Sequence, residues 1–172
     1  MEEQKKSQGS ASDDKPVLCS ALFFSEKVIR EAGTGKLSII NAFQSFYGKQ
    51  FPFASPPFIV TASFNNLSGK LDRLKATVEV LDADGKELVA PISGEFSSDR
   101  EVTREEIFDL SFMVPSCSFE KEGVYQIKFS VGDQLLGQRP LPARLIEQSD
   151  ASKNSAAAAS SSEKGEGKEK SG

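Results

Sequence analysis

The segment that most constrains the fold of this chain is the alternating stretch from Phe108 to Leu145. Large apolar side chains alternate with smaller or polar ones over residues 108–114 and again over 125–131. A period of two buries one face of a β-sheet and leaves the other in water. Gly132-Asp133 then supplies the positive φ that a two-residue hairpin turn requires. These residues predict three consecutive strands, the third ending near Leu145.

The rest of the chain has the same character, and no long amphipathic helix is expected. Further strands are predicted at 17–24 (continuing, bent, through 28–29), 37–47, 58–65, 73–81, 86–92 and 105–114. Three prolines make Gly48–Pro57 a crossing loop, because proline removes donors from a ladder. Ser97–Glu106 is expected to be a charged connection. Seven or eight short strands with a long Pro-rich crossing predict an all-β, immunoglobulin-like Greek-key sandwich.

The two ends of the chain differ in composition from the middle. Residues 1–15 have no large apolar side chain after Met1, and residues 149–172 have none. Such segments bury too little apolar surface to offset the entropy of ordering, so both tails are expected to be disordered. Residues 16–148 are then one domain with one core.

Charge and targeting signals indicate a soluble protein of the cytoplasm. The chain has 21 Lys and Arg against 25 Asp and Glu, a net charge of −4. This balance argues against a nucleic-acid partner, which needs a basic face. The N-terminus carries acidic residues where a signal peptide would be apolar, and no apolar run is long enough to cross a membrane. In a reducing compartment Cys19 and Cys117 are expected to be free thiols.

The chain contains no histidine, which removes the usual general base and the commonest metal ligand. Two cysteines alone cannot build an ordinary zinc site. Gly33–Lys36 is interpreted as a turn, because Arg30 replaces the first glycine of a phosphate loop and Leu37 its Ser or Thr. Asp82–Gly85 is interpreted as a hairpin turn and not as a calcium loop. We therefore expect no metal, no cofactor and no enzyme.

A cluster of carboxylates is the one candidate for acid–base chemistry. Its members lie on or beside the charged connection: Asp99, Glu101, Glu105, Glu106 and Asp109. Arg100 and Arg104 are interleaved with them, which favours a solvated, mutually paired loop over a catalytic pair.

Several segments together resemble a bacterial family of small uncharacterised proteins. The residues that carry the resemblance are Glu26–Phe43 (EKVIREAGTGKLSIINAF), Phe51-Pro52, Val80–Gly85 (VLDADG) and Gly123-Val124-Tyr125. The resemblance covers Val17 to Leu145 and implies an immunoglobulin-like sandwich, with no established activity or site. Asn41 stands where the family's pattern has glycine.

An aromatic loop is the candidate for partner binding. Phe51, Pro52 and Phe53 are expected to form an exposed apolar knob that another protein, or a second copy, recognises. The competing interpretation is that these rings fill the end of the sandwich core. The predicted function is a non-catalytic binding or assembly module that uses a loop end or a sheet edge. The alternatives are a small-ligand site between Gly48–Pro57 and Ser97–Glu106, or a structural homo-oligomer.

Overall fold

The computed structural model describes residues 17–146, and every regular element within them is a β-strand. The eight strands of seven or more residues are β1 (Leu18–Arg30), β2 (Leu37–Phe43), β5 (Phe58–Asn65), β6 (Gly69–Leu81), β7 (Ile92–Val102), β8 (Phe108–Val114), β10 (Gly123–Val131) and β11 (Gln134–Leu145). The short ones are β3 (Phe46–Gly48), β4 (Phe53–Ala54) and β9 (Ser118–Phe119). The all-β prediction is confirmed, while the predicted tails, 1–15 and 149–172, lie outside the described residues.

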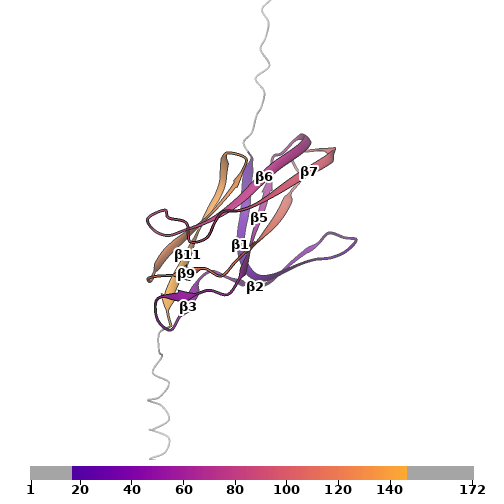
Figure 1. Cartoon of the computed structure of the whole chain (residues 1–172). Coiled ribbons are helices and arrows are strands. Elements are labelled where there is room, and N and C mark those ends of the chain that lie inside the picture. The colour runs from indigo at the N-terminus through magenta and orange to yellow at the C-terminus, as the bar shows by residue number, and fades with distance from the viewer. Residues whose placement is uncertain (1–16, 147–172) are drawn as a thin grey trace, which may run out of the picture.

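The long strands form two sheets that pack against each other (Figure 1). One has the order β2-β1-β5-β8 and the other β3-β11-β10-β6-β7, while β4 and β9 form a small separate pair. Neighbouring strands are antiparallel except β3 and β11, which are parallel. The hairpin between β10 and β11 turns at Gly132, whose φ of 56° is the positive value expected from the sequence.

Aromatic and β-branched residues from both sheets fill one core. The Phe64 ring of β5 lies 5.8 Å from Phe96 of β7 and 5.5 Å from Phe129 of β10, measured between ring centroids. Phe64 and Phe129 are both fully buried. These contacts cross from one sheet to the other, so the apolar faces of the two sheets are buried against each other in a single core.

The strand predicted over residues 37–47 is in fact two strands in two different sheets. β2 ends at Phe43, and the chain then crosses to the other sheet as β3, beside β11. The Phe43 and Phe46 rings pack together with centroids 4.8 Å apart. A continuous strand would place residues three apart on opposite faces. The break at 44–45 allows both rings to reach the core.

The prediction for residues 86–106 was wrong in its boundaries. Residues 86–92 make only a short antiparallel contact with the end of β6, the bridge between Leu81 and Glu87. The main partner of β6 is β7, which starts at Ile92 and continues to Val102 through most of the predicted charged connection. Charged side chains are compatible with β7 because it is the outer strand of its sheet and its polar residues face water. The ladder with β6 has register shifts near Leu71, so this edge is irregular.

Residues 27–30 of β1 and residues 37–40 of β2 form an arm. β1 pairs with β5 as far as Ser25, whereas residues 27–30 pair with β2 alone. In Figure 1 this two-stranded arm projects to the right of the sheets. Its tip, residues 31–36, is the predicted turn. The Gly35 amide donates a hydrogen bond to the Glu31 carbonyl at 3.0 Å, and Gly33 and Gly35 both have positive φ.

Candidate functional site

The aromatic loop places its rings against the core, and proline at the surface. Phe51 and Phe53 are half-buried, with centroids 5.0 Å apart, and Phe53 also packs 5.3 Å from the buried Phe119. A methyl group added at Gly48 would lie 2.3 Å from the Phe53 ring, so the ring rests directly on that backbone. Pro52 is exposed. The interpretation of Phe51 and Phe53 as core-packing residues is therefore the better one, and the exposed part of the expected knob is small.

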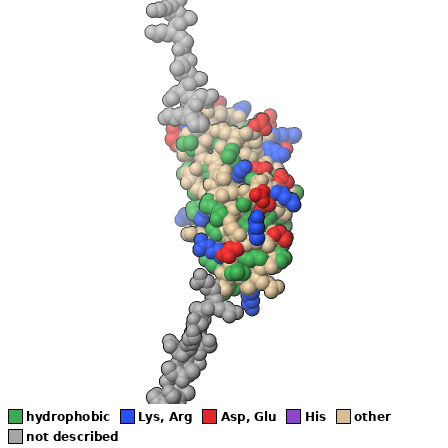
Figure 2. All heavy atoms as spheres, turned by 90° about the vertical axis from the view of Figure 1, so that its left-hand side faces the viewer, with side chains coloured by type: hydrophobic (Ala, Val, Ile, Leu, Met, Phe, Trp, Pro, Cys, Tyr) green, Lys and Arg blue, Asp and Glu red, His purple; other side chains and the backbone are tan. Residues whose placement is uncertain are grey.

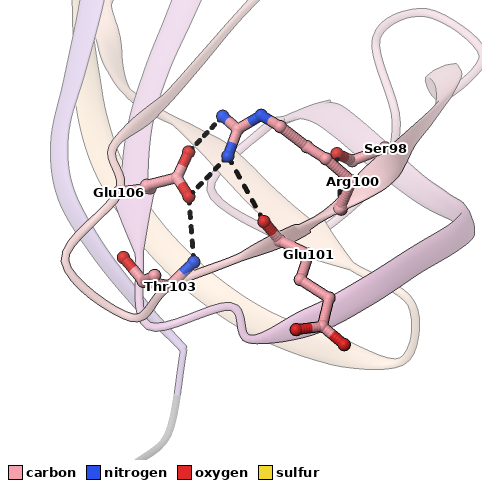
Figure 3. A network of polar contacts seen from close by, with 5 residues as sticks. All are labelled: Ser98, Arg100, Glu101, Thr103 and Glu106. Atoms are coloured by element: carbon pink, nitrogen blue, oxygen red, sulfur yellow. Dashed lines mark hydrogen bonds and ion pairs between the residues drawn. The ribbon is translucent and has the colours of Figure 1, made fainter.

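The acidic cluster is a paired surface loop (Figure 3). Arg100 donates from both terminal nitrogens to the two carboxylate oxygens of Glu106, one of these bonds being 2.8 Å, and the Thr103 amide donates to the same carboxylate at 2.9 Å. These donors hold the pKa of Glu106 at about 2, below its ordinary value of 4.5. Hydrogen bonds from its own backbone amide and from the Thr103 side chain lower the pKa of Glu105. Lowered pKa values suit carboxylates that stay ionised, whereas a general acid needs a raised one.

The turn Asp82–Gly85 and the acidic cluster lie at opposite ends of the second sheet, so their carboxylates cannot share a cation. Asp82–Gly85 follows the end of β6 that pairs with Gln126, whereas Asp99 lies beside the other end of that strand and Glu106 lies beyond it. The Asp82 carboxylate accepts the Asp84 and Lys86 amides at 2.9 Å each, so it closes its own turn. Among residues 17–146 no three His, Cys, Asp or Glu residues are grouped as metal ligands would be.

The same geometry separates the loops expected to flank a small-ligand pocket. Gly48–Pro57 begins at the last residue of β3, which pairs with the C-terminal end of β11, and contains β4, which pairs with β9. Residues 97–106 lie beside the first residues of β6, at the far end of the same sheet. The two loops therefore do not face each other across one pocket.

Both cysteines are free thiols in the structure. Burial raises the pKa of Cys117 to about 11 and also raises that of Cys19, although hydrogen bonds oppose both shifts. Cys19 packs against Gly137 of β11, where an added methyl group would lie 3.0 Å from its sulfur. These thiols are packed and protonated, which suits structural residues better than nucleophiles.

The free edge of β8 is the most open backbone feature of the fold. The other outer strands are each modified: β3 has three residues, β2 contains the left-handed Asn41, and β7 is charged and irregular. β8 pairs in unbroken register with β5 over all seven residues, and Asp109 is its one charged residue. A regular, nearly uncharged edge strand is a template for another strand.

Two hollows flank this strand, and together we call them the β8 trough. One, of about 350 Å³, lies between β8 and residues 92–96 of β7. The other, of about 420 Å³, lies between β8, Ile59 of β5, and the arm residues Val28, Arg30 and Leu37. Both are lined by the same three residues of β8: Leu110, Ser111 and Met113. The trough therefore has β8 as its floor, with β7 and the arm as its walls.

A guanidinium lies at one end of the trough. The exposed Arg30 donates from one terminal nitrogen to the Gly35 carbonyl at 3.0 Å, and from the other to the Asp109 carbonyl of β8 at 3.1 Å. No sequence pattern points to this site. Arg30 belongs to no recognised motif, and the position of β8 at an edge depends on strand pairings that alternation does not specify.

The opposite seam of the two sheets is closed. The Arg139 side chain of β11 donates to the Leu22 carbonyl of β1 and lies over the Phe24 ring, 4.6 Å from its centroid.

Figure 2 shows charges of both signs interspersed over one face of the molecule. Within residues 17–146 no helix has the length and apolar character needed to span a bilayer.

Two packed sheets with an open β8 edge define an all-β protein. The chain belongs to a family of unknown function (DUF6941), whose model matches residues 20–144, from β1 to β11. This confirms the resemblance to an uncharacterised family, and the bacterial origin stays a prediction. No curated protein matches the chain.

Proposed function

We propose that this chain is a non-catalytic binding module with an immunoglobulin-like sandwich, and that it binds an extended segment of another protein along β8. The carrying observation is the trough on both sides of a regular, nearly uncharged edge strand. An extended peptide added to such an edge gains main-chain hydrogen bonds, and flanking hollows accept its alternate side chains.

Strand order supports the immunoglobulin-like assignment. β1-β5-β8 corresponds to strands A, B and E, and β11-β10-β6-β7 to G, F, C and C′. The short β3 beside β11 then continues strand A in the second sheet. The Tyr125 hydroxyl donates to the Lys121 carbonyl at 2.9 Å, as in the tyrosine corner at the start of strand F.

This correspondence explains why β8 is an edge. In the constant-type fold strand D lies next to E, but between β7 and β8 the described chain has only a short connection, residues 103–107. The place beside β8 that strand D would take is thus open. An incoming segment of another protein would take that place, with a length of about 20 Å for seven residues.

The backbone of β8 offers donors and acceptors to such a segment. Ser63 and Asp109 are partners in the β5–β8 ladder, and their carbonyls accept from side chains of β1, Ser20 and Arg30 respectively. Both carbonyls therefore point away from the space between β5 and β8. Because orientation alternates along a strand, the backbone groups of Asp109, Ser111 and Met113 face the free edge. The Asp109 carbonyl is taken by Arg30, so Ser111 and Met113 are the residues whose amides and carbonyls an incoming strand would bind.

Selection of peptide ligands tests the proposal. Random twelve-residue peptides displayed on phage would be selected on the full chain, and enriched sequences synthesised and titrated. We expect dissociation constants in the micromolar range, and slower hydrogen exchange at the Ser111 and Met113 amides in the complex. Ser111→Pro, which removes an edge donor, and Met113→Glu should weaken binding at least about tenfold.

Val124→Glu is the matched control, because Val124 is 49% exposed against 58% for Met113 but lies on β10, away from the trough. It should bind like the wild type. Failure to enrich any peptide would contradict the proposal. Peptides that bind both trough variants as tightly as the wild type would contradict it equally.

A further inference from the structure

We infer that the segment bound in the β8 trough carries an acidic side chain that pairs with Arg30. The inference rests on the proposed function and adds the chemistry of the partner. Arg30 lines the hollow on the arm side of β8 and is exposed. Among residues 17–146 no carboxylate lies within ion-pair distance of it.

The hydrogen bonds of Arg30 leave most of its donors available. A guanidinium has five N–H groups in a planar fork, and two of them are used, on the Gly35 and Asp109 carbonyls. These two bonds fix the side chain beside the edge of β8 without neutralising its charge. A carboxylate is the group whose geometry and charge match the remaining donors.

One carboxylate, that of Asp109, lines the arm-side hollow together with Arg30, but it accepts a hydrogen bond from the Ser63 hydroxyl of β5 and forms no ion pair with the guanidinium. Glu95 lines the other hollow, on β7. Among the residues that line the two hollows Arg30 is the one basic side chain, so a carboxylate of the bound segment is expected to pair on the arm side.

The alternation of side chains along a strand predicts the sequence pattern of the bound segment. A strand added beside β8 would point alternate side chains toward β7 and toward the arm. The apolar side chains that line the hollow on the β7 side are Ile92 and Phe96 of β7 and Leu110, Phe112 and Met113 of β8. The occupant is thus an extended segment with apolar residues at every second position and an Asp or Glu at an intervening position.

A double-mutant cycle tests the pairing by measuring the affinities of peptide variants for the wild-type protein and for the Arg30 variant. Peptides enriched on the full chain would be synthesised with the acidic residue, with its amide counterpart, and with an amidated C-terminus. We expect the amide peptide to bind the wild type about tenfold more weakly. On Arg30→Gln the two peptides should bind alike, and Lys27→Gln, a change in an exposed cation of the same arm, should retain the preference.

The outcomes separate the two proposals. Peptides that protect the β8 amides but show no preference for the acid would overturn the role of Arg30 and leave strand addition intact. Loss of binding on C-terminal amidation alone would assign Arg30 to a terminal carboxylate and overturn the side-chain pairing. Absence of any peptide ligand would overturn both proposals. Thermal unfolding of Arg30→Gln checks that the arm and sheets remain folded.

Discussion

At the scale of single residues, Asn41 shows how one backbone conformation constrains sequence. Its φ is 53°, in the left-handed region, and the family pattern that the chain resembles has glycine here. We expect Asn41→Ala to be less stable than Asn41→Gly by about 1 kcal/mol, because a Cβ is strained at this φ. Both variants lose the hydrogen bond from Asn41 Nδ2 to the Glu26 carboxylate, so the difference between their free energies of unfolding in urea measures the backbone strain alone. Equal free energies of unfolding would contradict a strained left-handed backbone at residue 41.

Glu106 makes a residue-scale prediction about pH. Its folded-state pKa of about 2 is below the ordinary value of 4.5, so ionised Glu106 stabilises the fold above pH 4.5, and this contribution is lost as the pH falls toward 2. The difference in melting temperature between wild type and Glu106→Gln should shrink across that window. Arg100→Gln removes the main cause of the lowered Glu106 pKa, so in that background the effect of Glu106→Gln on the melting temperature should be smaller. The effect is small, because the Arg100 side chain is 68% exposed and solvent screens the pair. A difference that stays constant from pH 6 to pH 2 would sink the prediction.

At the scale of elements, Tyr125 joins the start of β10 to the loop before it. Its ring is buried, and its hydroxyl donates to the Lys121 carbonyl at 2.9 Å. Tyr125→Phe should lower the free energy of unfolding by about 1 kcal/mol, since one net hydrogen bond is lost. Tyr47→Phe is the control, because Tyr47 is 59% exposed and should lose almost nothing. Two variants that lose equal stability in urea would show that the hydroxyl does not fix this loop.

The elements also show what sequence patterns could and could not predict. Alternation located β5, β8 and β10, and Gly132 predicted the β10–β11 turn, because these signals are local. The crossing after Phe43 was missed, because it depends on two rings meeting in a core that local pattern does not describe. The charged residues of β7 were predicted to be a loop, because they show no alternation of apolar and polar side chains. An outer strand can lack that alternation, since few of its side chains are buried. β8 itself was predicted as a strand but not as an open edge, because strand order depends on pairings that alternation does not specify.

At the scale of the whole molecule, the two sheets depend on one core. Buried side chains of both sheets form a single hydrophobic cluster. We therefore expect both sheets to unfold in a single cooperative transition. Phe64 tests this, because its buried ring packs between Phe108 of its own sheet and both Phe96 and Phe129 of the other.

Phe64→Ala should lower the free energy of unfolding by about 3–5 kcal/mol, the cost of a large cavity in a packed core. Hydrogen exchange should show this loss equally in amides of β5 and of β10, although only β5 carries the change. Phe23→Ala, on the same β1–β5–β8 sheet but 39% exposed, should cost about 1 kcal/mol or less. Amides of one sheet that lose protection while the other keeps it would mean that the sheets are separate folding units, and that the shared core does not couple them.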